Sequence, residues 1–211
     1  MDFQYFGGGC VLITTKKLQI LIDPPKPEYK LKLPKLKPDV ILKTEVGSEG
    51  FKHNGEFLIE SPGEYEIKGV MIQGIPARLH IDKKEDRRRA IMYSITTGDL
   101  HTLVTGNISP GLNEAQLEAI GEIDILTIPV GGKGLTLDAN SAAKLVSQLE
   151  PRYVIPIHYA EDKANYPVPQ DSIGNFLKEI GSETTNPQAK FKITNKDLAE
   201  DTQIIVLKPG P

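Results

Sequence analysis

The stretch from Ile123 to His158, IDILTIPVGGKGLTLDANSAAKLVSQLEPRYVIPIH, indicates the fold class most clearly. Residues Ile123–Val130 form a continuous apolar run, which is typical of a buried strand. The segment Asp138–Leu149 has helical periodicity behind a capping aspartate, and Tyr153–Ile157 is a second candidate for a buried strand. Strand and helix therefore alternate here, and we expect loops at the strand ends to carry any functional site.

The residues before this stretch predict mainly strands, separated by glycines and polar turns. Gly98-Asp99 and His53-Asn54-Gly55 carry hairpin signals, and the proline- and lysine-rich segment Pro24–Pro38 is expected to cross the surface. Helices are expected at Asn113–Ile120 and Gln170–Ile180. Strands followed by mixed units indicate an α/β protein with sheets flanked by helices. The predicted strands are Phe3–Phe6, Cys10–Thr14, Leu18–Ile22, Val40–Lys43, Phe57–Ile59, Glu64–Ile67, Val70–Ile75, Ile91–Thr96, His101–Val104, Lys190–Ile193 and Gln203–Leu207.

The composition is that of an ordinary globular protein. Of 211 residues, 39% are hydrophobic and 25% are charged, so a sizeable core can form, and we expect residues 1–211 to make one domain. A formal charge of -3 gives no indication of a polyanionic partner. The start, MDFQYFGGGCVLITT, lacks a secretion signal, and no run approaches the length of a membrane span. We therefore expect a cytoplasmic protein without a membrane segment.

Three motifs, taken together, resemble those of a known family. They are Ile20–Pro24 (ILIDP), Ser61–Glu66 (SPGEYE) with Gly69-Val70, and Asp124–Gly132 (DILTIPVGG) leading to Ile155–Tyr159 (IPIHY). Their order is that of the metal-dependent hydrolases of the metallo-β-lactamase fold, and the chain is similar to the UlaG-like branch over most of its length. The resemblance implies an αββα sandwich of two mixed β-sheets flanked by helices.

The resemblance also implies where metal ligands would stand. In such hydrolases a loop supplies His-x-His-x-Asp-His, because neutral imidazoles and carboxylates bind a divalent metal that activates water. In this chain the four ligand positions read Glu45, Gly47, Glu49 and Gly50. Two of the four positions therefore have no side chain that could bind a metal.

The other ligand positions are also altered. The family's His-x-Gly-Asp falls on residues 104–107, with Val104 in place of the histidine and Asn107 in place of the aspartate. Gly8 stands where the family has a polar residue that faces the site. Only His158 matches a family ligand, and we interpret it as a histidine whose ring nitrogens satisfy nearby backbone groups rather than as a metal ligand.

We interpret the chain as a hydrolase homologue that has lost most of its metal ligands and binds a small molecule or a protein without catalysis, needing no cofactor. One alternative is a remnant site of Glu45, Glu49, Asn107 and His158 that holds a single divalent cation, Zn, Mn or Mg, and hydrolyses phosphoester, ester or lactone bonds. Another is a subunit that acts by interaction, with homo-oligomer formation left open.

The remaining candidates favour structural roles. Cys10 lies among apolar residues and is expected to be a buried, inert thiol. His53 and His101 are interpreted as solvated turn residues, and the pair His80 and Asp82 is displaced from the family's spacing. The basic cluster at 83–89 is interrupted by two acids and lacks stacking aromatics, so nucleic-acid binding is not expected. The glycines at 131–134 lack the spacing of a phosphate-binding loop.

Overall fold

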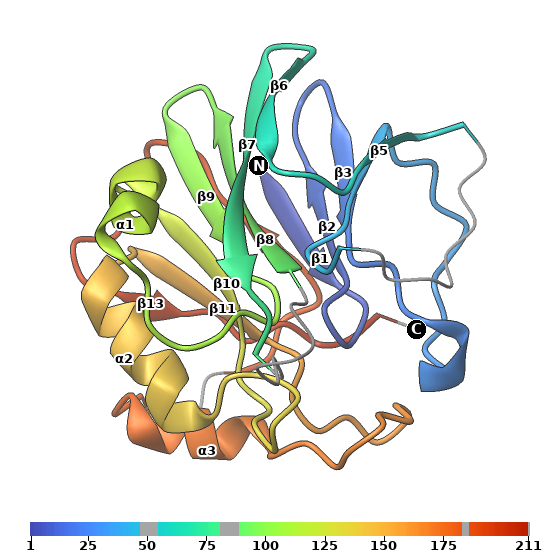
Figure 1. Cartoon of the computed structure of the whole chain (residues 1–211), viewed down its shortest axis with the longest axis vertical. Coiled ribbons are helices and arrows are strands. Elements are labelled where there is room, and N and C mark those ends of the chain that lie inside the picture. The colour runs from blue at the N-terminus through green and yellow to red at the C-terminus, as the bar shows by residue number, and fades with distance from the viewer. Residues whose placement is uncertain (47–54, 81–88, 183–185, 211) are drawn as a thin grey trace.

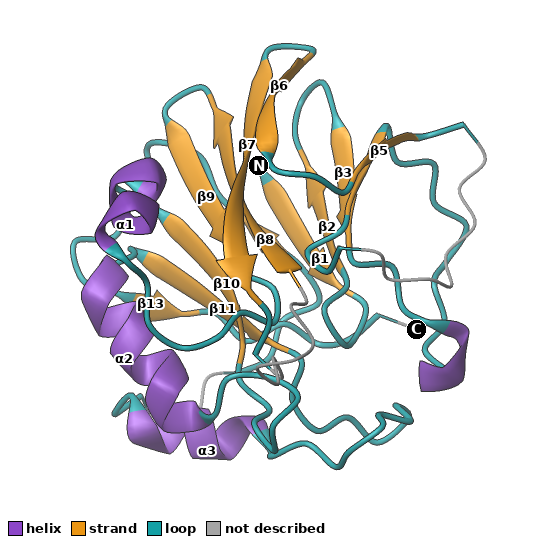
Figure 2. Cartoon of the chain, viewed as in Figure 1, coloured by secondary structure: helices purple, strands orange, loops and turns teal. Residues whose placement is uncertain are grey.

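The computed structural model describes residues 1–46, 55–80, 89–182 and 186–210. Two β-sheets pack against each other, and the three α-helices of the described residues lie along the outer side of one sheet (Figure 1). Figure 2 shows these three helices beside one sheet, whereas loops and one short helical turn lie beside the other. The expected α/β sandwich of two mixed sheets is therefore confirmed.

The first sheet has the strand order β12-β1-β2-β3-β4-β5. The pairs β12–β1, β1–β2 and β2–β3 are antiparallel, whereas the pairs β3–β4 and β4–β5 are parallel. The predicted strands are confirmed to within about one residue at most ends, although the last one is shorter than expected. Their bounds are β1 Asp2–Tyr5, β2 Val11–Thr14, β3 Gln19–Ile22, β4 Val40–Leu42, β5 Phe57–Ile59 and β12 Phe191–Lys192.

Both faces of this sheet are buried. Alternate residues point to opposite faces of a strand, so Val11 and Ile13 enter the main core between the sheets. Cys10 and Leu12 instead belong to a second cluster, against which Leu33 and other residues of the proline-rich segment pack. That segment therefore covers the outer face of the first sheet, and Cys10 is a buried thiol, as expected.

The second sheet has the order β13-β11-β10-β9-β8-β7-β6. Its β6 to β9 form an antiparallel meander, and β9, β10, β11 and β13 run parallel. The parallel strands β10 and β11 are buried throughout, which explains their continuous apolar sequences. The bounds are β6 Gly63–Ile67, β7 Val70–Arg78, β8 Arg89–Thr97, β9 Leu100–Val104, β10 Ile125–Pro129, β11 Tyr153–Ile157 and β13 Gln203–Ile204.

The two hairpin signals have different outcomes. Gly98, with φ of 61°, turns the chain between the antiparallel strands β8 and β9, so that hairpin is confirmed. The other signal begins at His53 and Asn54, which lie outside the described residues. The strands on either side of it, β4 and β5, pair parallel, so a hairpin between these two strands is wrong.

Capping residues mark the starts of the first two α-helices. Helix α1 (Glu114–Ile120) has a capping box at Asn113, and α2 (Ala139–Leu149) is capped by the Asp138 carboxylate. Helix α3 (Ile173–Glu179) starts three residues later than predicted. Asp171 explains the difference, because its backbone N–H donates to Gly131 and its carbonyl accepts from Ala160. A short 3-10 helix, η1 (Pro27–Tyr29), was not predicted.

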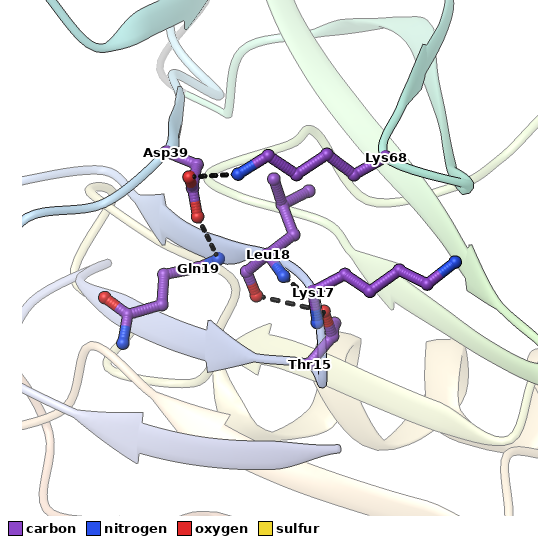
Figure 3. Close-up of polar contacts among 6 residues, drawn as sticks. All are labelled: Thr15, Lys17, Leu18, Gln19, Asp39 and Lys68. Carbon is purple, nitrogen blue, oxygen red and sulfur yellow. Dashed lines mark hydrogen bonds and ion pairs between the residues drawn. The ribbon is translucent and has the colours of Figure 1, made fainter.

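Asp39 links the two sheets at the amino ends of β3 and β4 (Figure 3). One carboxylate oxygen accepts a hydrogen bond from the backbone N–H of Gln19 at 2.9 Å, and the other accepts from Lys68 Nζ at 2.6 Å. Lys68 lies in the turn between β6 and β7, so the contact joins the first sheet to the second. These bonds hold the pKa of Asp39 below its usual value, with the Lys68 contact as the larger cause.

No helix in the described residues combines the length and the apolar character that crossing a bilayer requires.

Candidate functional site

A cavity of about 60 Å³ lies where strands of both sheets end. The carboxyl ends of the parallel strands β3 and β4 meet those of β9, β10 and β11 around it. Loops at such an edge are free to carry functional side chains. We call this space the strand-end cavity, and its lining residues are Gly8, Gly9, Asp23, Pro24, Pro25, Lys26, Tyr29, Lys43, Thr44, Glu45, Gly106, Asn107, Pro129 and His158.

His158 follows β11 directly and is only 3% exposed. Its φ of 52° is unusual for a residue other than glycine, and its backbone N–H donates to the Tyr5 hydroxyl at 2.9 Å. Neither ring nitrogen has a hydrogen-bond partner among the described residues. The prediction that these nitrogens satisfy nearby backbone groups is therefore wrong for the described residues, and His158 lines the cavity instead.

Burial also keeps the His158 ring neutral. Loss of solvent lowers its pKa to about 4, and the nearby ammonium of Lys26 acts in the same direction. A neutral imidazole has one N–H donor and one acceptor nitrogen. The ring of Tyr166 packs beside it, with the two ring centroids 4.9 Å apart. His158 therefore offers one donor and one acceptor in a closely packed position.

Asn107 reaches the cavity from the loop after β9. Its side-chain oxygen is buried and has no hydrogen-bond partner in the described part of the chain. Gly106 precedes it with φ of 61° and packs so closely on Thr44 that a Cβ atom would collide with the threonine side chain. This close approach of the loops from the two sheets explains why glycine stands at 106.

Asp23 is a site residue that the sequence interpretation quoted only as part of a fold motif. It has φ of 41°, and its carboxylate accepts from the Thr44 N–H at 2.8 Å and from the Thr44 hydroxyl at 2.5 Å. Burial raises the pKa of Asp23 to about 6, although the bonds from Thr44 oppose the rise. Its place directly after β3 was the signal that could have identified it.

Lys26 and Glu45 carry opposite charges at the cavity. Lys26 Nζ lies 3.8 Å from a Glu45 oxygen, which is too far for a hydrogen bond. The ammonium group of Lys26 makes no hydrogen bond in the described part of the chain, and the side chain is 32% exposed. The sequence interpretation considered Glu45 but not this lysine.

Tyr166 and Glu161 fill the region beside Gly8. The Gly8 N–H donates to the Tyr166 hydroxyl at 2.8 Å, which donates in turn to a Glu161 oxygen at 3.1 Å. The other Glu161 oxygen accepts from the Tyr5 hydroxyl. A Cβ at Gly8 would lie 3.6 Å from a methyl carbon of Leu31 and 3.7 Å from the Tyr166 oxygen. These are ordinary van der Waals distances, so it is the φ of 58° rather than a collision that favours glycine at this position.

The candidate metal ligands are only partly brought together. Glu45, Asn107 and His158 line the same cavity, whereas Glu49 lies outside the described residues. Val104 ends β9 as a core residue that is 1% exposed and has no ligand atom. No group of three or more His, Cys, Asp or Glu side chains among the described residues could hold a metal ion. By themselves, these residues do not fit a metal centre.

The other candidates that the structure describes are not part of the cavity lining. His101 is an exposed residue within β9 rather than in a turn. His80 is half-buried, and burial lowers its pKa. His53, Asp82 and the cluster at 83–88 lie outside the described residues. Gly131 packs against the His158 carbonyl, so its role is a close backbone approach, and Lys133 pairs with Asp171 at 3.0 Å.

Known proteins support this fold. The model of the β-lactamase superfamily domain matches residues 2–158. A UPF0173 protein of Pyrococcus furiosus is 26% identical over 185 residues, covering 75% of this chain and 83% of that protein. A UPF0173 metal-dependent hydrolase of Pyrococcus horikoshii is 33% identical over 150 residues, covering 70% of this chain but 56% of that protein. This chain therefore spans little more than half the length of that relative.

Solved structures agree on the fold. A metallo-β-lactamase superfamily protein of Thermotoga maritima superposes with a TM-score of 0.73 at 21% identity, covering 98% of this chain and 97% of the other. A metallo hydrolase of Ignicoccus hospitalis gives a TM-score of 0.65 at 18% identity, covering 100% and 96%. With the matched domain model, the two-sheet architecture and the strand-end position of the cavity, the chain belongs to the β-lactamase superfamily, in its metallo-β-lactamase fold.

Proposed function

We propose that this chain binds a small molecule in the strand-end cavity and has given up metal-dependent hydrolysis. The observation that carries this proposal is the lack of hydrogen-bond partners for the His158 ring. Both of its ring nitrogens are buried and without a partner among the described residues. Buried polar atoms without partners cost free energy, so these atoms are expected to meet a bound molecule or ordered water.

The donor set supports binding without a metal. A catalytic zinc site commonly has three protein ligands and one open position. In the described residues His158 is accompanied by the Asn107 amide and by Glu45, whose charge is already opposed by Lys26. An ammonium group beside the only matching histidine would repel a cation.

Metal content tests the proposal directly. The protein is purified without chelator, and bound metals are measured by elemental mass spectrometry in the wild type, His158→Ala and the exposed control His101→Ala. We expect far less than one metal ion per chain in all three proteins, even after incubation with Zn, Mn or Mg. Stoichiometric metal in the wild type and His101→Ala, but not in His158→Ala, would contradict the proposal.

The second candidate is a hydrolase with one divalent cation, and two observations favour it. Relatives such as the Pyrococcus horikoshii protein are named metal-dependent hydrolases, and Glu45, Asn107 and His158 share one cavity. A bound cation would supply a Lewis acid for phosphoester, ester or lactone hydrolysis. If the metal assay finds a His158-dependent ion, turnover of these three substrate classes becomes the next measurement.

We also infer that residues 1–211 act as one domain. The first strand pairs with β12 near the other end of the chain, and Tyr5 forms a bridge with Pro209. Limited proteolysis is expected to leave these segments associated after a cut in an exposed loop.

A further inference from the structure

Lys26 places a positively charged ammonium group in the lining of the strand-end cavity. Lys26 Nζ has three N–H groups, none of which makes a hydrogen bond in the described part of the chain. Its contact with Glu45, at 3.8 Å, is an attraction between charges only. A ligand oxygen that carries negative charge would gain a charge-assisted hydrogen bond here.

The buried polar atoms of His158 and Asn107 favour a ligand group that both donates and accepts hydrogen bonds. The neutral imidazole presents one donor and one acceptor, and the Asn107 side-chain oxygen is an acceptor. A hydroxyl can donate to one of these groups and accept from another, whereas a methyl group can do neither. The buried atoms therefore favour a ligand with a hydroxyl next to its charged end.

Size and charge limit the ligand further. A space of about 60 Å³ holds only a few non-hydrogen atoms, since one water needs on the order of 10–15 Å³. Lys26 and Lys43 line the cavity together with Asp23 and Glu45, and Lys43 also pairs with Glu60 at 3.8 Å, so the lining has no excess of positive charge. A single negative charge is easier to accommodate there than the double charge of a phosphate.

We propose that the strand-end cavity binds a small hydroxylated carboxylate, with its carboxylate at Lys26 and its hydroxyl at His158 and Asn107. This inference rests on the proposed function, because the same cavity must be free of metal. Lys26 then supplies the positive charge that a metal supplies in a hydrolase of this fold, and holds the ligand without activating water.

Ligand titration tests the proposal with four probes: glycolate, acetate, methyl glycolate and inorganic phosphate. Binding to the full chain is followed by saturation-transfer NMR and by calorimetry at neutral pH. We expect glycolate to bind about tenfold more tightly than acetate, which lacks the hydroxyl. Methyl glycolate lacks the charge and phosphate carries more of it, and both are expected to bind at least about tenfold more weakly than glycolate.

Two lysine variants test whether the ligand carboxylate contacts Lys26. Lys26→Met is expected to weaken glycolate binding at least about tenfold. The matched control, Lys35→Met, changes an exposed lysine of the same proline-rich segment outside the cavity lining and should leave binding unchanged. Circular dichroism and thermal unfolding of both variants verify that the fold is retained.

The possible results separate the two proposals. Absence of glycolate binding at millimolar concentration, equal binding of glycolate and acetate, tighter binding of phosphate or methyl glycolate, or wild-type affinity in Lys26→Met would each overturn this inference. If a neutral fragment then binds in a His158-dependent way, the proposed function still stands. If the protein instead holds stoichiometric metal at His158, both proposals fail.

Discussion

The hydroxyl of Tyr166 accepts a hydrogen bond from the backbone N–H of Gly8, across 158 residues of sequence. Through this contact, the loop after β11 is attached to the glycine turn between β1 and β2. The tyrosine also packs on His158 and donates to Glu161. The position of Gly8 in the cavity lining is therefore supported by a residue beyond the segment that matches the superfamily domain, residues 2–158.

Tyr166→Phe should destabilise the protein by about 1–3 kcal/mol, because the Gly8 N–H and a Glu161 oxygen each lose a partner in a largely buried position. The free energy of unfolding is measured by urea titration. Tyr29→Phe is the matched control, since no hydrogen bond of the Tyr29 hydroxyl is seen in the described residues and its ring contacts Tyr166. Equal losses in the two variants would contradict this role for the Tyr166 hydroxyl.

His158 should make stability depend on pH below neutrality. Its folded pKa is about 4, whereas an unfolded histidine titrates near 6.5, so the unfolded chain binds the proton more readily. Stability from this group is present above about pH 6.5 and is lost as pH falls towards 4, by up to about 3 kcal/mol. His158→Gln should remove this loss in urea titrations from pH 4 to 7, and an unchanged slope would argue against a buried neutral ring.

Asp23 should act in the opposite direction over an overlapping range. Its folded pKa is raised to about 6, whereas an unfolded aspartate titrates near 3.9, so the folded chain holds the proton more tightly. Its contribution is present below about pH 4 and is lost as pH rises through 6, by roughly 1–3 kcal/mol. Asp23→Asn should therefore make stability rise more steeply with pH than in the wild type.

The same urea titrations measure the difference in slope between wild type and Asp23→Asn. Asp39→Asn is a useful control, because the pKa of Asp39 is lowered and its removal should not steepen the rise. A flatter profile in Asp23→Asn than in the wild type would be the contrary result.

Gly106 and Gly98 give a paired test of the close approach between the sheets. Both have φ of 61°, but only a Cβ at Gly106 would collide with Thr44, whereas nothing lies within 4 Å of a Cβ at Gly98. Gly98→Ala should cost about 1 kcal/mol through backbone strain alone. Gly106→Ala should cost roughly 2–3 kcal/mol more, because the loops from the two sheets must separate. Similar melting temperatures for the two variants would exclude this packing constraint.

The parts of the fold that could be predicted are mostly those set by neighbouring residues in the sequence. Asn113 and Asp138 are capping residues with immediate neighbours as partners, so they set the starts of α1 and α2 correctly. The start of α3 was misplaced because Asp171 forms backbone hydrogen bonds with residues distant in sequence, including Gly131. Such long-range bonds leave no pattern in the local sequence.

The site could be predicted only where a family motif marks it. His158 follows the IPI of β11, and Asn107 follows the glycine after β9, so both could be placed in advance. Lys26, Glu161 and Tyr166 lie in irregular segments without periodicity. Only the folded chain brings Lys26 into the cavity lining and the other two residues beside Gly8. The positive charge of Lys26 at the cavity is therefore a feature that motif comparison does not evaluate.

The Tyr5 hydroxyl also has consequences for the order of folding. It accepts from the His158 N–H and donates to Glu161, partners that lie 153 and 156 residues further along the chain. Contacts between residues so distant in sequence form slowly, because a long loop must close first. On a ribosome, β1 to β3 can pair early, but the pocket cannot be completed until the loop after β11 has emerged. A chain cut short before residue 158 would thus contain most strands of both sheets and still lack His158 and the loop that completes the strand-end cavity.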